Sequence, residues 1–169
     1  MDSIKWLASH YGTDEGSMKE VLKTERATTY LLIWPVFEQE LFGGFMMCKD
    51  IPAKATEYQT LVTSDHIDEM AIHFHKRYKD SENKRHLLHD QKNNPLFDSI
   101  INKEYDDLSI EDKVVLLLFV SYRYRNNIFH GNKNVRTWKN YTTEIDYCLD
   151  FMMMLLDSYT RGKVVGPDE

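Results

Sequence analysis

The segment from Tyr122 to Lys133, with the sequence YRYRNNIFHGNK, contains residue types that handle phosphate. Arg125 carries a planar guanidinium, which can bind a phosphate group through two parallel N–H donors. His130 carries an imidazole whose reference pKa of about 6.5 lets it exchange protons near neutral pH. If these two side chains lie close together, they form a site that can bind a phosphodiester and transfer a proton beside it.

Such a pair suits RNA better than DNA as a substrate. RNA supplies its own nucleophile, the 2′-hydroxyl next to the scissile phosphate, so one imidazole acting as general base or acid can accelerate cleavage about 10²–10⁴-fold. The arginine would stabilise the charge that develops on the phosphate. Activating water against DNA would call for a metal. His86 and His89 could face the same way on a helix and hold one, but no HExxH pattern and no cysteine accompanies them. We therefore expect no metal site and no cofactor.

Charge is distributed unevenly along the chain. The net charge of −6 argues against general nucleic-acid binding, yet the stretch from Lys113 to Thr143 has six lysines and arginines and no acidic residue. Because screening limits electrostatic reach to about 8 Å at physiological salt, a ligand near this stretch would experience mainly its positive charge. Lys133, Arg123 and Asn127 are the RNA contacts that we expect there. The alternative is a basic face that acidic neighbours neutralise in the fold.

The elements around the pair are expected to be helical. The run Val114–Val120 is apolar on every side, which is typical of a central buried helix. On one continuous helix Arg125 and His130 would point roughly 140° apart. The two asparagines after Arg125 are poor helix formers, and the glycine after His130 tolerates positive φ. We therefore expect the helix to break between Arg125 and His130, so that the chain turns back and the two side chains meet.

The same residues also fit a purely structural interpretation. An arginine near a helix C-terminus is favoured by the helix dipole, by about 0.3–1 kcal/mol. Asn126 or Asn127 would then cap the helix, and His130 with the glycine after it would form an ordinary turn. Spacing alone leaves both interpretations open.

Elsewhere apolar residues recur at helical spacing, whereas strand patterns are weak. We expect a short helix over 3–10, a long helix from a capping box at Ser17 to about Phe42 that Pro35 kinks or divides, a loop around Ile51 and Pro52, a helix over 65–78 capped by Ser64, a helix over 95–102, the central helix after Ser109, and a last helix over 143–161. The sequence thus predicts an all-α fold, a single helical bundle of five to six helices.

Length and composition describe one domain. With 169 residues, the chain suits a single helical domain over residues 1–161, followed by a flexible C-terminal tail over 162–169. The longest apolar run has seven residues, whereas a membrane span needs roughly 20. Cys48 and Cys148 are too few for a disulfide framework, so we interpret both as thiols in a reducing compartment. We expect a cytoplasmic protein without a membrane partner.

The string Arg125-Asn-Asn-Ile-Phe-His130 resembles the R-x4-6-H signature of the HEPN superfamily, including the polar residue that the family favours directly after the arginine, here Asn126. Continued through Lys133, it is similar to the version found in HEPN proteins of prokaryotic defence and toxin–antitoxin systems. The longer motif covers nine residues. A helical bundle with this motif between its last two major helices matches most of the chain loosely.

The resemblance implies a HEPN-like fold and a metal-independent endoribonuclease that leaves 2′,3′-cyclic phosphate ends. It also implies a homodimer with both motifs at the two-fold interface, so that each chain supplies one histidine. In this scheme the catalytic residues are His130, which transfers protons, Arg125, which binds phosphate, and Asn126, which orients the pair or the RNA. Lys133 would contact a phosphate, and Glu38 would brace the site as acidic residues do in some relatives.

Three functions compete. The first is an RNase toxin or defence effector that cuts intracellular RNA, such as tRNA, with a separate antitoxin or sensor protein as partner. The second is a non-catalytic helical module of HEPN type that dimerises or binds a partner protein. The third, a metal-dependent hydrolase that uses His86 or His89, ranks last.

Overall fold

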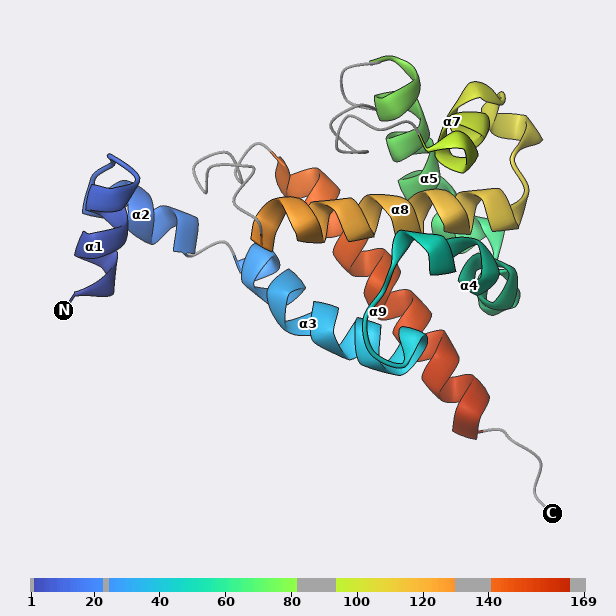
Figure 1. The fold of residues 1–169 in the computed structure, drawn as a ribbon, viewed down its shortest axis with the longest axis horizontal. Helices are drawn as coiled ribbons and strands as arrows, with labels where there is room; N and C mark the ends of the chain where they lie inside the picture. Colours follow the sequence, from blue (N-terminus) through green and yellow to red (C-terminus); the bar gives the residue numbers. More distant parts are fainter. Residues whose placement is uncertain (1, 23–24, 82–93, 130–140, 165–169) are drawn as a thin grey trace.

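The computed structural model describes residues 2–22, 25–81, 94–129 and 141–164 (Figure 1). These ranges contain eight α-helices, three short 3-10 helices and no strand, so the expected all-α class is confirmed, with more helices than the five to six expected. The α-helices are α1 (Ser3–His10), α2 (Glu15–Leu22), α3 (Glu25–Phe42), α4 (Ile51–Tyr58), α5 (Ser64–Lys79), α7 (Pro95–Asn102), α8 (Ile110–Phe129) and α9 (Thr142–Val164). The 3-10 helices are η1 (Cys48–Asp50), η2 (Gln59–Leu61) and η3 (Tyr105–Asp107).

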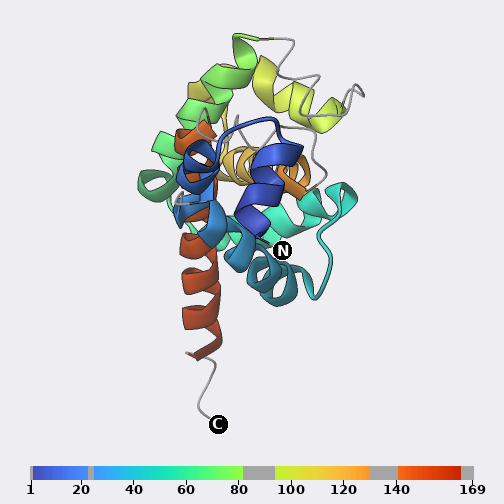
Figure 2. The same cartoon turned by 90° about the vertical axis from the view of Figure 1, so that its left-hand side faces the viewer.

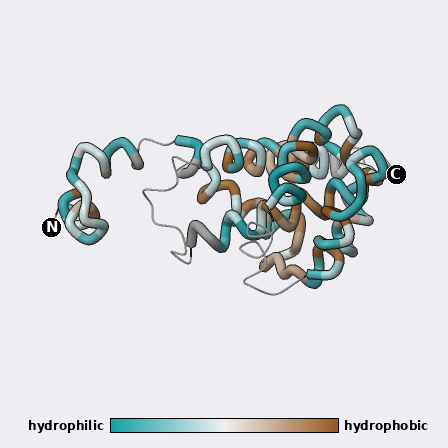
Figure 3. Tube along the Cα trace, turned by 90° about the horizontal axis from the view of Figure 1, so that it is seen from above, coloured by the Kyte–Doolittle hydropathy of each residue, from teal (hydrophilic) through white to brown (hydrophobic). Residues whose placement is uncertain are grey.

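Helix α8 lies at the centre of the fold. Every residue of the run Val114–Val120 is buried, as the apolar sequence predicts. Helices α4, α5, α7 and α9 all pack against α8, and α3 packs along α9. Figure 3 shows the hydrophobic stretches concentrated where these helices meet. The end of α8 that carries the arginines is therefore positioned by α3 on one flank and by α5 and α9 on the other.

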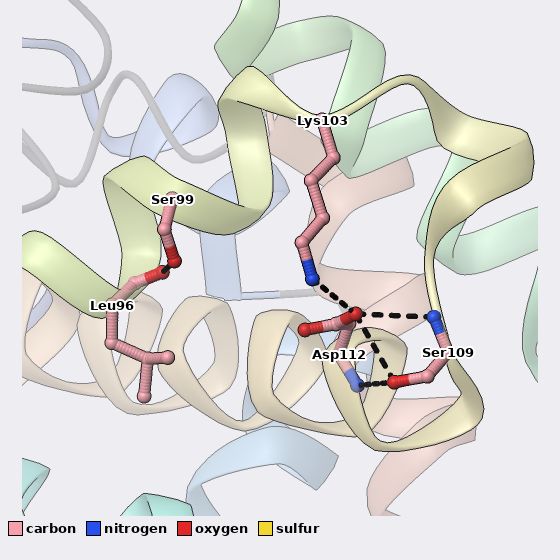
Figure 4. A network of polar contacts seen from close by, with 5 residues as sticks. All are labelled: Leu96, Ser99, Lys103, Ser109 and Asp112. Atoms are coloured by element: carbon pink, nitrogen blue, oxygen red, sulfur yellow. Dashed lines mark hydrogen bonds and ion pairs between the residues drawn. The ribbon is translucent and has the colours of Figure 1, made fainter.

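The start of α8 is fixed by a reciprocal cap (Figure 4). The backbone N–H and the hydroxyl of Ser109 each donate to the Asp112 carboxylate over 3.1 Å, and the Asp112 N–H donates to the Ser109 hydroxyl over 3.1 Å. Lys103 adds an ion pair to the same carboxylate at 2.8 Å. The expected cap at Ser109 is thus confirmed, because a short polar side chain satisfies N–H groups that have no partner inside the helix.

The first 42 residues differ in part from expectation. Helix α1 has the expected bounds, and Gly12 follows it at a φ of 59°, which a glycine adopts without strain. The expected long helix consists instead of α2 and α3. Asp14 caps α2 by accepting the Ser17 N–H over 2.8 Å, so the prediction of a capping box that begins at Ser17 is wrong. Pro35 lies inside α3 without dividing it, and the two glycines after Phe42 follow the end of that helix at positive φ.

Helices α1 and α2 form a pair that stands to one side of the other helices (Figure 1). They pack mainly on each other, and bury Ala8 and Met18. These two residues are not part of the main hydrophobic core, which begins at Tyr30. The opposite end of the molecule is formed by the last turns of α9, which project beyond the neighbouring helices in both Figure 1 and Figure 2.

Three further expectations need correction. The loop expected around Ile51 and Pro52 is the start of α4, where the fixed φ of proline suits the first turn. Ser64 lies inside α5, and the capping position before it, Thr63, makes no side-chain hydrogen bond to the helix. Helix α9 continues through residues 162–164, so the expected tail over 162–169 starts too early, and 165–169 lie outside the described residues. Helix α7 begins and ends where the sequence predicts.

Among the described residues, none of the helices combines the length and the apolar character that a membrane crossing needs. Cys48 and Cys148, both in described regions, form no disulfide with each other.

Candidate functional site

The candidate site begins in the last turns of α8. This helix continues to Phe129, so the break expected between Arg125 and His130 does not occur at Asn126, Asn127 or the two residues that follow them. The reason is tertiary: α8 is held by helices on several sides, and this packing outweighs the weak helix propensity of asparagine. His130, like Lys133, lies outside the described residues, and so does the side chain of Asn127. The expected meeting of Arg125 with His130 stays a prediction.

Arg125 lies on the flank of α8 that faces α3. Its Nη1 donates to the Asn126 Oδ1 over 2.9 Å, and its guanidinium carbon lies 5.8 Å from the centre of the Trp34 ring. The residue is half-buried. A cation over an indole face is attracted by the ring's negative potential, so the indole helps to fix the orientation of the guanidinium. Two of the three residues expected to be catalytic, Arg125 and Asn126, are therefore in direct contact.

Tyr30 ties α3 to the backbone of α8 just before Arg125. The Tyr30 hydroxyl donates to the Ser121 carbonyl over 2.6 Å, and the Tyr30 ring stacks on Trp34 with centroids 6.2 Å apart. Burial raises the pKa of Tyr30 well above its usual value, although the nearby Arg125 acts in the opposite direction. The tyrosine therefore stays protonated and keeps its donor at neutral pH.

Two other residues named from the sequence have different surroundings. Arg123 is only 6% exposed, which argues against a direct contact with RNA. Glu38 is also buried, and its carboxylate accepts the Met46 N–H over 3.1 Å. Glu38 lies one helical turn beyond Trp34, and its hydrogen bond with Met46 holds the loop that follows α3. The predicted role of Glu38 as a brace for the site gains no support from this contact.

The other flank of the α8 end carries an ion pair that sequence reasoning missed. Arg77 of α5 binds the Glu144 carboxylate at 2.5 Å, and His73 Nε2 lies 3.7 Å from the same carboxylate. The side chain of Glu144 is 7% exposed and that of Arg77 19%. The Arg77 guanidinium also lies 5.8 Å from the centre of the Tyr141 ring, which in turn makes an edge contact with Tyr124 at 6.2 Å.

This cluster joins α5 to the end of α8 and the start of α9. Burial disfavours the charge of Arg77, but the neighbouring Tyr124 and Glu144 outweigh it and raise the pKa of Arg77 above its usual value. Burial also raises the pKa of Tyr124 far above its usual range. The cluster thus holds one buried carboxylate against one permanent cation, an arrangement that suits structural support better than proton transfer.

The basic stretch expected to attract RNA is not a single exposed surface. Lys113 is buried and makes an ion pair with Asp68 at 2.8 Å, so it lies among neutralising partners, as the alternative interpretation allowed. Arg123 is buried as well. Of the basic residues described in this stretch, Arg125 is the one that remains half-exposed.

In the parts of the chain that the structure covers, no three histidine, cysteine, aspartate or glutamate side chains are grouped as a metal ion would require. His86 and His89 lie outside those parts. A comparison with models of protein families gave no match, and neither did comparisons with curated proteins and with solved structures.

Proposed function

We propose that the chain is a metal-independent endoribonuclease of HEPN type that acts in the cytoplasm as part of a prokaryotic defence or toxin–antitoxin system. The observation that carries the proposal is the guanidinium of the half-buried residue Arg125, in contact with Asn126 and Trp34, five residues before His130. An arginine oriented before the substrate arrives can bind a phosphate and stabilise the charge of the transition state without reorganisation.

The proposed reaction is a transesterification within the RNA. The 2′-hydroxyl oxygen attacks the adjacent phosphorus while a neutral imidazole takes its proton. The bond between phosphorus and the 5′-oxygen breaks, and a protonated imidazole donates a proton to that leaving oxygen. The products are a 2′,3′-cyclic phosphate and a 5′-hydroxyl. One base and one acid are needed, and a homodimer supplies them as His130 from each of two chains at a two-fold axis.

In this proposal Arg125 binds the scissile phosphate and Asn126 orients the guanidinium through the hydrogen bond between them. Lys133 and Asn127 contact the RNA next to the scissile bond. Arg123 is omitted from these contacts because it is buried. The RNA, such as a tRNA, and a separate antitoxin or sensor protein are the partners that this function requires.

The test is cleavage of RNA in the presence of EDTA. Arg125→Ala and His130→Ala are each expected to lower the rate by about 10² or more, the usual contribution of such groups. Arg26→Ala is the matched control, because Arg26 is another arginine whose guanidinium is paired with the carboxylates of Asp146 and Asp150. The proposal fails if the wild-type chain does not cleave RNA under these conditions, or if all four proteins cleave at the same rate.

Growth provides a second measurement. Expression of the wild-type chain should slow growth, and expression of the His130→Ala chain at the same level should not. Equal growth with both chains would count against a toxin or effector, even if cleavage were observed in vitro.

An alternative function is a non-catalytic helical module that dimerises or binds a partner protein. Large apolar side chains on the surface favour it: Leu32 is 70% exposed and Phe45 82%. Isolated exposed apolar residues are common on soluble proteins, so this observation carries less weight than the oriented arginine. Dimerisation without RNA cleavage would support the alternative.

A further inference from the structure

A buried indole lies under the candidate phosphate-binding arginine, and its N–H is not used in a hydrogen bond to any described residue. Trp34 is 1% exposed, and among the described residues its indole N–H has no hydrogen-bond partner. A buried donor without an acceptor costs free energy, because water no longer solvates it. A phenylalanine would present an aromatic face at this position without that cost.

The contact that distinguishes the indole is the one with Arg125. Tryptophan offers the most electron-rich aromatic face and binds cations better than phenylalanine or tyrosine does. The Arg125 guanidinium carbon lies 5.8 Å from the centre of the Trp34 ring. The cation gains more here than on an exposed surface, because the buried ring gives it a poorly hydrated neighbour.

Trp34 is itself held in one orientation from both sides along α3. Tyr30 stacks on it at an interplanar angle of 18°, and Phe37 contacts it at 5.8 Å with a tilt of 40°. Tyr30 is anchored in turn to the α8 backbone at Ser121. The plane of the indole is therefore set by residues of α3, and the Tyr30 hydrogen bond fixes that part of α3 to α8, the helix that carries Arg125.

We propose that Trp34 is a positioning residue for Arg125, holding the guanidinium in the orientation in which it receives a phosphate. The inference rests on the proposed function, since it assigns the role of Trp34 through that arginine. A side chain held by an aromatic face on one side and by the Asn126 carboxamide on another has fewer orientations to lose when the phosphate binds. Trp34 itself does not touch the RNA.

The experiment compares Trp34→Phe, Trp34→Leu and the matched control Phe97→Leu. Phe97 is a fully buried aromatic residue of α7 that packs on Tyr78 of α5 and on Phe119 in the middle of α8. Trp34→Leu should lower kcat/KM for RNA about tenfold, as expected for loss of one buried cation–π contact. Trp34→Phe retains an aromatic face and should recover most of that loss. Phe97→Leu should lower the melting temperature comparably but leave kcat/KM unchanged.

A double-mutant cycle tests whether Trp34 acts through Arg125. In an Arg125→Ala background, Trp34→Leu should have no further effect on kcat/KM, because the positioned group is already absent. The inference is overturned if the two losses multiply, if Phe97→Leu lowers kcat/KM as much as Trp34→Leu, or if Trp34→Phe is no better than Trp34→Leu.

A spectroscopic measurement separates this inference from the proposed function. The NMR signal of the Arg125 Nε–H should be displaced by the ring current of Trp34, and the displacement should disappear in Trp34→Leu. If the wild-type chain cleaves no RNA but the signal behaves in this way, the proposed function fails and the positioning of Arg125 by Trp34 stands. A signal that is unchanged in Trp34→Leu refutes the positioning whatever the activity.

Discussion

Removing the negative charge of the buried Glu144 side chain should destabilise the fold. Its carboxylate lies 2.5 Å from Arg77 and 3.7 Å from His73, with 7% of the side chain exposed. The substitution Glu144→Gln preserves size and shape but removes the negative charge. It leaves the guanidinium of Arg77, 19% exposed, without its counter-charge at the contact of α5 with α9.

The size of the effect follows from this burial. Removing one partner of a buried ion pair typically costs about 3–5 kcal/mol, because the remaining charge stays desolvated. Arg77 keeps some contact with water and lies over the Tyr141 ring, so we expect the lower end, about 3 kcal/mol. For a chain of this size, that corresponds to a melting temperature lower by about 6–12 °C.

The assay is urea unfolding followed by circular dichroism, with Glu57→Gln as the matched control. Glu57 pairs with Lys54 at 2.9 Å, but the two side chains are 49% and 28% exposed. An exposed pair contributes about 0–1 kcal/mol, so the control should be nearly neutral. A second variant, Arg77→Met combined with Glu144→Leu, should recover most of the loss because no unpaired charge remains. A cost below about 1 kcal/mol for Glu144→Gln would refute the reasoning.

Three smaller predictions concern titratable groups in described regions. Burial raises the pKa of Asp112, but hydrogen bonds from Lys103 and Ser109 outweigh it and lower the pKa overall. The stability that the ionised carboxylate gives to the fold is therefore lost as pH falls below about 4, the pKa in the unfolded chain, and on through the lower pKa in the folded chain. The decline in the free energy of urea unfolding over this pH range should be smaller in Asp112→Asn. Burial and the nearby Lys79 lower the pKa of His75. The free energy of unfolding should therefore fall as pH drops below about 6.5, because the histidine of the unfolded chain takes up a proton at a higher pH than that of the folded chain. His75→Gln should remove this dependence of stability on pH. Burial raises the pKa of the Cys148 thiol far above its usual range, so iodoacetamide should alkylate it only after unfolding, as mass spectrometry of the native and the urea-treated chain would reveal.

Local sequence patterns predicted those parts of the fold that local interactions determine. The apolar run Val114–Val120 identified the buried helix, and Ser109 its start, because a cap depends on side chains three residues apart. The bounds of α7 followed from Pro95 in the same way. The boundary errors lie where tertiary packing overrides propensity: α8 runs through Asn126, and α9 continues past Gly162.

The candidate site shows a similar division between local and tertiary information. Residue type singled out Arg125, and the resemblance to the R-x4-6-H signature singled out Asn126 directly after it. Nothing in the sequence indicates that Trp34, ninety-one positions earlier, lies under that arginine, because the contact exists only through the packing of α3 beside α8. Arg77 and Glu144 were missed for the same reason, since they meet only where α5 approaches α9.

Helical geometry explains why the two flanks of the α8 end contact different helices and have different roles. Consecutive residues on a helix point about 100° apart, so Tyr124 and Arg125 must face different neighbours. Tyr124 faces Phe74 of α5 and Tyr141 beside α9, whereas Arg125 faces Trp34 of α3. Tyr124 and Phe74 on the first flank are buried, whereas Arg125 on the second flank is half-buried. Loss of Glu144 should therefore lower stability, and loss of Trp34 should lower the rate of RNA cleavage even where stability is matched.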